Sequence, residues 1–134
     1  MSNLPAPQDA PPVVGVIDSD PVARSGLRTL LHGLGIDVAT FDSAESYLLA
    51  HNGRHLACLI VDLLLPGMSG LELLRRVRSA GNDVPVILLA DESDVPTAVA
   101  AMREGATDFI EKPYVDVAVL KQVQKLLHRP SVNV

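Results

Sequence analysis

The chain is poor in aromatic side chains: it contains two phenylalanines, two tyrosines and no tryptophan. Stacking platforms for nucleic-acid bases are therefore not expected. The net charge of −5 and the dispersed basic residues also argue against a nucleic-acid surface. No apolar run approaches the roughly 18–20 residues that span a bilayer, so we expect no membrane segment.

Cysteine is nearly absent as well. The single Cys58 lies inside an apolar run, cannot form an internal disulfide and is expected to be a small buried core residue. Together with the absence of a recognisable signal peptide, this predicts a cytoplasmic location. The 134 residues, 48% of them hydrophobic, suffice for one compact domain. We expect it over residues 13–128, between a flexible Pro-rich tail at 1–12 and a short tail at 129–134.

Short apolar runs alternate with stretches of helical periodicity along this domain. The expected strands are Val13–Ile17, Ile36–Phe41, Leu56–Val61, Val84–Leu89 and Thr107–Ile110. The expected helices are Pro21–His32, Ala44–His51, Gly70–Ser79, Val95–Glu104 and Val117–Leu127. Five strand–helix units in series predict an α/β fold with a doubly wound parallel sheet, because each crossover helix must pack back on the sheet.

The charged residues after the first, third and fifth expected strands form a candidate site. Asp18 follows the first strand, Asp62 the third, and Lys112 follows the fifth. The carboxyl ends of parallel strands share one rim, so these side chains should converge there. Clustered carboxylates repel each other unless a cation shares them, and oxygen ligands suit Mg²⁺. Two carboxylates, a cation and a lysine are what phosphoryl transfer onto a carboxylate needs, with Asp62 as the nucleophile.

The motifs around these residues carry a family resemblance: V-I-D, L-I-V-D-L-L-L-P-G-M-S-G-L-E-L-L and G-A-T-D-F-I-E-K-P. From Val13 to Leu127 the chain resembles a CheY-like response-regulator receiver domain, and its sequence motifs are most similar to those of FixJ-type receivers. The resemblance implies a flavodoxin-like fold, a five-stranded parallel sheet in the order 2-1-3-4-5 with five helices. It also implies a two-component signalling module that catalyses at most its own phosphorylation and dephosphorylation.

The resemblance assigns roles to matching positions only. Asp62 is implied to be the phosphoacceptor and, with Asp18 and the Leu64 backbone carbonyl, a ligand of Mg²⁺. Lys112 is implied to pair with the phosphate. Pro113 follows it in a peptide bond that is often cis.

Two positions depart from the family pattern. Ser19 stands where the second acid of an adjacent pair supplies a metal ligand, which predicts weaker Mg²⁺ binding. Ala90 stands where a Thr or Ser hydroxyl binds the phosphoryl group, so Phe109, at the aromatic switch position, has less reason to move on phosphorylation. Asp91 and Glu92 either add negative charge beside the phosphate or face water, and the sequence leaves both interpretations open.

Asp20 also allows two interpretations. It directly precedes Pro21, and an Asp cap with Pro at the first helical position is a common helix start. It could instead reach the cation, through water, as a further metal group.

The resemblance implies a histidine kinase or a phosphotransfer protein as the partner. It also implies a homodimer through the fourth helix, fifth strand and fifth helix. FixJ-type receivers usually precede a DNA-binding domain; none follows here, so we expect a stand-alone receiver or a fragment. The alternative function is a pseudo-receiver that binds a partner without phosphorylation. A small-molecule enzyme is disfavoured, because no Gly-rich phosphate loop opens the first helix.

Overall fold

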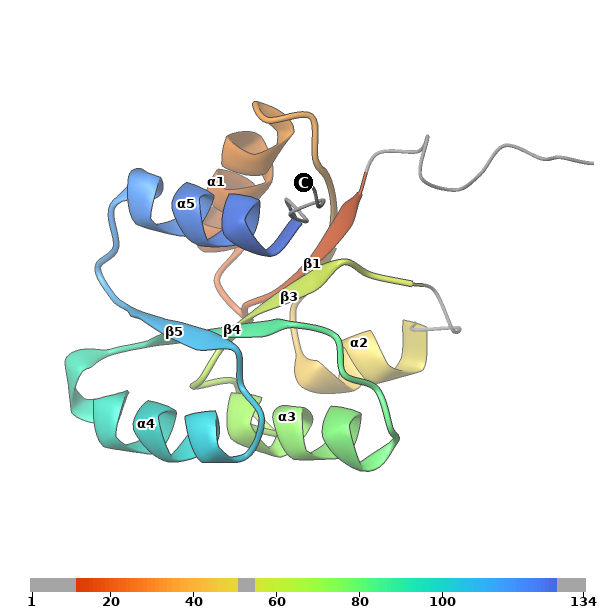
Figure 1. Cartoon of the computed structure of the whole chain (residues 1–134), viewed down its shortest axis with the longest axis vertical. Coiled ribbons are helices and arrows are strands. Elements are labelled where there is room, and N and C mark those ends of the chain that lie inside the picture. The colour runs from red at the N-terminus through yellow and green to blue at the C-terminus, as the bar shows by residue number, and fades with distance from the viewer. Residues whose placement is uncertain (1–11, 51–54, 128–134) are drawn as a thin grey trace, which may run out of the picture.

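The computed structural model describes residues 12–50 and 55–127, in which strands alternate with helices (Figure 1). The strands are β1 (Val13–Ile17), β2 (Asp37–Phe41), β3 (Cys58–Asp62), β4 (Val86–Ala90) and β5 (Asp108–Glu111). The helices are α1 (Pro21–His32), α2 (Ala44–Ala50), α3 (Gly70–Ser79), α4 (Val95–Arg103) and α5 (Asp116–Leu127), with a 3-10 helix, η2 (Glu92–Asp94), before α4. The predicted tails lie outside the described residues, except for Pro12, which is exposed.

All five strands are parallel and lie in the order β2-β1-β3-β4-β5, which confirms the predicted topology. Helices α1 and α5 cover one face of the sheet, and α2, α3 and α4 cover the other (Figure 1). Every residue of β3 and β4 is buried, as expected for central strands with helices on both faces. The central strands therefore end at a rim that lies between the two helical layers.

Strands β3, β4 and β5 begin and end one or two residues later than predicted. The apolar pattern reports burial: Leu56 and Val84 are buried, but they precede the hydrogen-bonded ladder. The ladder instead continues into polar residues and includes Asp62 and Glu111. The helices agree with the prediction to within one residue at each described end, and His51, predicted to end α2, lies outside the described residues.

Two apolar clusters, one on each side of the sheet, make up the core. The cluster under α2, α3 and α4 contains Tyr47, whose ring meets that of Phe41 edge-on at 5.3 Å between centroids. The cluster under α1 and α5 contains Cys58, which is free and fully buried, as predicted. Burial raises the pKa of the Cys58 thiol to about 12. Within the described ranges, no helix has the length and apolar character needed to cross a membrane.

Candidate functional site

Side chains from three strand ends meet at the carboxyl rim of the sheet. Lys112, directly after β5, places its Nζ 3.2 Å from each carboxylate oxygen of Asp62, the last residue of β3. Asp18, directly after β1, is 3% exposed and Asp62 is 6% exposed. The structure thus gathers two buried carboxylates and one lysine, from positions far apart in the sequence.

The charges of this cluster influence one another. Burial raises the pKa of the Asp18 carboxyl, the Asp20 backbone N–H that donates to it at 2.9 Å opposes the rise, and the Asp62 carboxylate adds to it. Burial opposes the charge of Lys112, but the carboxylates around it, Asp62 foremost, leave its pKa raised. Two carboxylates against one ammonium leave an excess of negative charge, which a cation would relieve.

The donor chemistry of the rim fits Mg²⁺. This ion takes oxygen ligands, keeps several waters, and is commonly bound by one or two carboxylates. Asp18 and Asp62 are such carboxylates, and the backbone N–H of Leu64 donates to Asp62 Oδ1 at 3.2 Å, which holds this loop next to the acid. Across residues 12–50 and 55–127 there is no cluster of three or more His, Cys, Asp or Glu side chains that could hold a metal. The carboxylates that the rim offers to a cation in buried positions are therefore those of Asp18 and Asp62.

Asp20 is the N-cap of α1. Its Oδ1 accepts the N–H of Val22 at 2.9 Å, and Pro21 occupies the first turn of the helix. This confirms the cap interpretation. Ser19 beside it is exposed and carries no charge. A contact of Asp20 with the cation stays a prediction.

The end of β4 differs from the end of β3. Ala90 is 1% exposed and has no polar side-chain atom, while its carbonyl accepts the Lys112 N–H at 2.8 Å. Asp91 follows, with its Oδ1 3.9 Å from Lys112 Nζ and its side chain 52% exposed. Of the two interpretations that the sequence left open, Asp91 satisfies both: it faces water and it approaches the site. Glu92 is exposed.

Strand β5 and the segment after it contain two further residues singled out in the sequence. Phe109 is half-buried and packs against the core cluster under α2, α3 and α4. The Lys112–Pro113 peptide bond is cis. Phe109 thus contacts the core from the strand that leads to Lys112, and its role as a switch stays a prediction.

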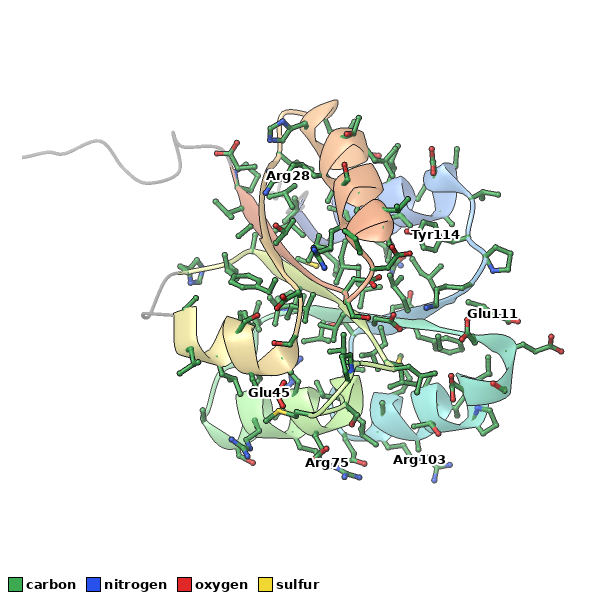
Figure 2. All side chains as sticks on the ribbon, turned by 180° about the vertical axis from the view of Figure 1, so that it is seen from behind. Arg28, Glu45, Arg75, Arg103, Glu111 and Tyr114 are labelled. Atoms are coloured by element: carbon green, nitrogen blue, oxygen red, sulfur yellow. The ribbon has the colours of Figure 1, made fainter. Side chains whose placement is uncertain are left out.

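Sequence reasoning missed several residues that hold the rim in place. Arg24 Nη1 donates to the Asp18 carbonyl at 2.6 Å, a contact between a helix and a strand end for which the sequence carried no signal. Burial raises the pKa of Tyr114, which follows Pro113, and Asp18 adds to the rise. Glu45 lies on the opposite side of the sheet from Tyr114 (Figure 2), and nothing in the sequence indicated its contact with the loop after Asp62.

One hydrogen bond and two glycines shape the loop that follows Asp62. Glu45 of α2 accepts the Met68 N–H at 2.8 Å. A Cβ on Gly67, which has φ +74°, would lie 2.6 Å from the Glu45 carboxylate, and a Cβ on Gly70 would lie 2.6 Å from the Asp62 carbonyl oxygen. Glycine at position 70 therefore allows α3 to begin directly against the end of β3.

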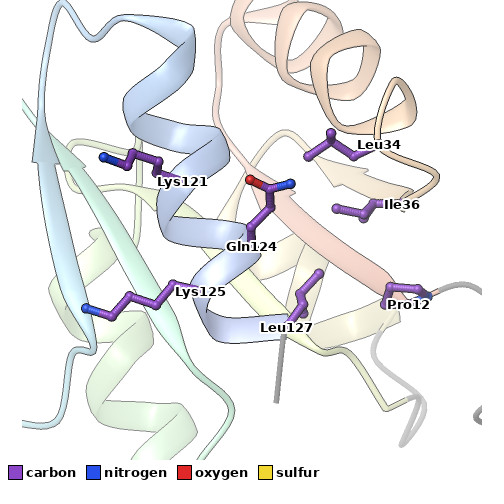
Figure 3. Close-up of a pocket in the computed structure, with 7 residues that line it drawn as sticks. All are labelled: Pro12, Leu34, Ile36, Lys121, Gln124, Lys125 and Leu127. Atoms are coloured by element: carbon purple, nitrogen blue, oxygen red, sulfur yellow. The ribbon is translucent and has the colours of Figure 1, made fainter. Parts of the chain in front are cut away.

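A hollow of about 850 Å³ lies far from this rim, between α1 and α5 near the start of β1 (Figure 3). Its lining consists of Pro12, Leu34, Ile36, Lys121, Gln124, Lys125 and Leu127. It contains none of the rim residues, and its walls are largely apolar. The charged cluster at the rim, and not this hollow, is therefore the candidate functional site.

The response regulator receiver domain family matches residues 14–124. The chain is 43% identical over 122 residues to the C4-dicarboxylate transport transcriptional regulatory protein DctD of Pseudomonas aeruginosa, which covers 91% of this chain and 26% of DctD. It is 40% identical over 118 residues to the transcriptional regulatory protein FixJ of Azorhizobium caulinodans, with 88% and 56% covered. The chain thus spans about a quarter of one relative and about half of the other.

Solved structures give the same picture. Full-length FixJ from B. japonicum superposes with a TM-score of 0.82 at 35% identity, over 87% of this chain and 58% of that one. A response regulator receiver protein from Pseudoalteromonas atlantica gives a TM-score of 0.81 at 35% identity, over 87% and 98%. The similarity covers most of the present chain in both cases.

Proposed function

The chain belongs to the response regulator receiver domain family, and from this membership we propose that Asp62 accepts a phosphoryl group from a histidine kinase or phosphotransfer protein. Phosphorylation on aspartate and the use of Mg²⁺ are typical of the family, whose members are signalling modules in two-component systems and not classical enzymes. The observation that carries the proposal is the contact of Lys112 with both oxygens of Asp62, at 3.2 Å. A buried carboxylate held by one lysine is suited to receive an anionic group.

The proposed reaction transfers the phosphoryl group between two side chains. An oxygen of Asp62 forms a bond to phosphorus while the bond from phosphorus to the donor imidazole nitrogen breaks, and the imidazole leaves with the electron pair. Lys112 pairs with the oxygens of the transferred group. Asp18, Asp62 and the Leu64 carbonyl would hold Mg²⁺, which neutralises charge on that group.

The proposal includes weakened metal binding and weakened switching. Ser19 gives the metal a neutral and weak ligand. Asp20 already caps α1 with one oxygen, and we propose that it reaches the cation, if at all, through water. Ala90 cannot donate a hydrogen bond to a phosphoryl oxygen, a contact typically worth about 1.5–3 kcal/mol. Without that hydrogen bond, phosphorylation of Asp62 gives the Phe109 side chain less reason to change its rotamer.

Mass spectrometry of the intact protein tests this function. The wild type and Asp62→Asn are incubated with a small-molecule phosphodonor across a titration of Mg²⁺. We expect a gain of about 80 Da that requires Mg²⁺ and is absent from the variant. Circular dichroism of Asp62→Asn controls for folding, and a gain of equal size in the variant would place the phosphate elsewhere.

A second candidate function follows from Ser19 and Ala90. With both departures, the domain would act as a phosphorylation-independent pseudo-receiver that binds a partner constitutively. The same experiment separates the two functions, since a protein that stays unmodified at millimolar Mg²⁺ favours the constitutive binding module.

The contact surface belongs to the proposal too. The predicted contact face of α4, β5 and α5 includes two helices that carry exposed apolar side chains, among them Val99 and Met102 of α4 and Val117 of α5. We expect this face to form the homodimer or to contact an output partner, in the cytoplasm. The named relatives are transcriptional regulators, whereas this acidic chain is expected to contact protein and not nucleic acid.

A further inference from the structure

Lys112 lies between two carboxylates that differ in their distance from its ammonium group and in their exposure to water. Its Nζ contacts both oxygens of Asp62 at 3.2 Å and lies 3.9 Å from Oδ1 of Asp91. The Asp62 side chain is 9% exposed, and the Asp91 side chain is 52% exposed. The tighter contact is therefore with the buried acid, and the looser one with an acid that can also turn to water.

The backbone fixes Asp91 beside the lysine. The Lys112 N–H donates to the carbonyl of Ala90 at 2.8 Å, which ties the residues after β5 to the end of β4. The Asp91 carbonyl in turn accepts the Asp94 N–H at 2.9 Å and so begins η2. The chain is held on both sides of Asp91, so its carboxylate stays within reach of Lys112 and only the side chain can swing.

A phosphoryl group on Asp62 would need the same ammonium. The phosphoryl group carries about 1.5 to 2 negative charges, in place of the single charge of the free carboxylate. No second lysine or arginine in the described part of the chain pairs with Asp62. The Asp91 carboxylate attracts Lys112 away from that group and repels an approaching anionic donor. Both effects act in the same direction.

Resting on the proposed function, we propose that Asp91 restrains the phosphorylation of Asp62: its carboxylate competes with the phosphoryl group for Lys112 and repels the donor. Asp91 acts through Lys112 and is a positioning residue. In the test reaction with acetyl phosphate, an Asp62 oxygen bonds to phosphorus, the phosphorus–oxygen bond to the acetyl group breaks, and acetate leaves with the electron pair.

The experiment compares the wild type, Asp91→Asn, Asp91→Glu and the control Glu92→Gln with acetyl phosphate and Mg²⁺. Glu92 is the adjacent acid, it is exposed, and it forms no ion pair among the described residues. The initial rate of phosphorylation is followed by intact mass at low salt and at about 1 M salt. We expect Asp91→Asn to raise the rate about fivefold at low salt, the effect of one partly exposed charge, while Asp91→Glu and Glu92→Gln stay within twofold of the wild type.

The salt series separates charge from shape. At about 1 M salt the screening length falls to about 3 Å, so the gain in Asp91→Asn should shrink towards the wild-type rate. A gain that persists in full at high salt would indicate a change of shape and would overturn the inference. So would equal rates for Asp91→Asn and Glu92→Gln with an active wild type, an outcome that leaves the proposed function intact.

Two further outcomes distinguish the two proposals. An inert wild type beside a phosphorylated Asp91→Asn would support the inference, with Asp91 as the block. If neither protein is phosphorylated at any Mg²⁺ concentration, the proposed function fails, and the role of Asp91 fails with it.

Discussion

Two neighbouring strands, β3 and β4, end at the same rim and deliver opposite chemistry. β3 ends in Asp62, a buried acid held by Lys112 at 3.2 Å. β4 ends in Ala90, which is equally buried and has no polar side-chain atom, and Asp91 follows at 3.9 Å from the same lysine. The ladder fixes both ends equally well, so the fold determines where a side chain arrives and the residue type determines what it does there.

The comparison divides the rim into two halves. The half built by β1, β3 and β5 carries Asp18, Asp62 and Lys112, the charges that the proposed phosphoryl transfer uses. The half built by β4 ends in Ala90 and so lacks a hydroxyl that could bind the proposed phosphoryl group. Removing a charged group from the first half should therefore slow phosphorylation strongly. Restoring a hydroxyl to the second half should tighten the binding of a phosphoryl group.

The largest effect on phosphorylation is expected from removing the ammonium charge that pairs with Asp62 at the end of β3. Lys112→Met deletes a hydrogen-bonded ammonium, a contact worth about 1.5–3 kcal/mol, so the rate of phosphorylation should fall by roughly 10- to 100-fold. Phosphate-affinity gels measure the rate, and Lys121→Met, at the remote hollow beside α5, is the matched control. A rate within twofold of the wild type would remove Lys112 from the site.

Restoring the hydroxyl at β4 should make the two strand ends alike. Ala90→Thr should bind beryllofluoride, a mimic of the phosphoryl group, about tenfold more tightly than Ala90→Val, because the two side chains share a shape and differ in the hydroxyl. Fluorine NMR measures the affinity. Equal binding by the two variants would show that the hydroxyl has no partner in this site.

A smaller gain is expected where the acidic pair is broken. Ser19→Asp adds a carboxylate beside Asp18, and Mg²⁺ affinity should rise about fivefold through one added charge. Ser19→Asn keeps the size without the charge and should stay at the wild-type affinity. Calorimetric titration with Mg²⁺ tests this, and equal affinities of the two variants would contradict it.

The smallest effect concerns the cap of α1. Asp20→Ala removes the oxygen that accepts the Val22 N–H and should lower the free energy of unfolding by about 1 kcal/mol in urea titrations. Mg²⁺ affinity should change less than twofold. Asp20→Ser keeps a capping oxygen without the charge; if it binds Mg²⁺ much more weakly at unchanged stability, Asp20 belongs to the cation site after all.

The sequence was sufficient to predict the convergence of Asp62 and Lys112, because parallel strands share a carboxyl rim whatever their loops do. Strand boundaries were less accurate. An apolar run such as that around Leu56 reports burial, and burial continues beyond the hydrogen-bonded ladder. The cap by Asp20 was predictable because it depends only on adjacent residues.

The direction of Asp91 could not be predicted from the sequence. Its side chain is placed by the turn into η2, a three-residue helix too short to show a period. The contact of Arg24 with the Asp18 carbonyl is likewise a tertiary contact between a helix and a strand end. Such contacts depend on how elements pack, and the pattern within each element does not contain that information.

The hydrogen bond from Met68 to Glu45 has a practical consequence for following the domain in solution. It joins α2 to the loop after the acceptor at 2.8 Å. The Met68 amide can exchange its hydrogen with deuterated solvent only when that bond opens. The exchange rate of this single amide therefore reports how often the loop opens. It can be measured without a chemical label, whether or not Asp62 is phosphorylated.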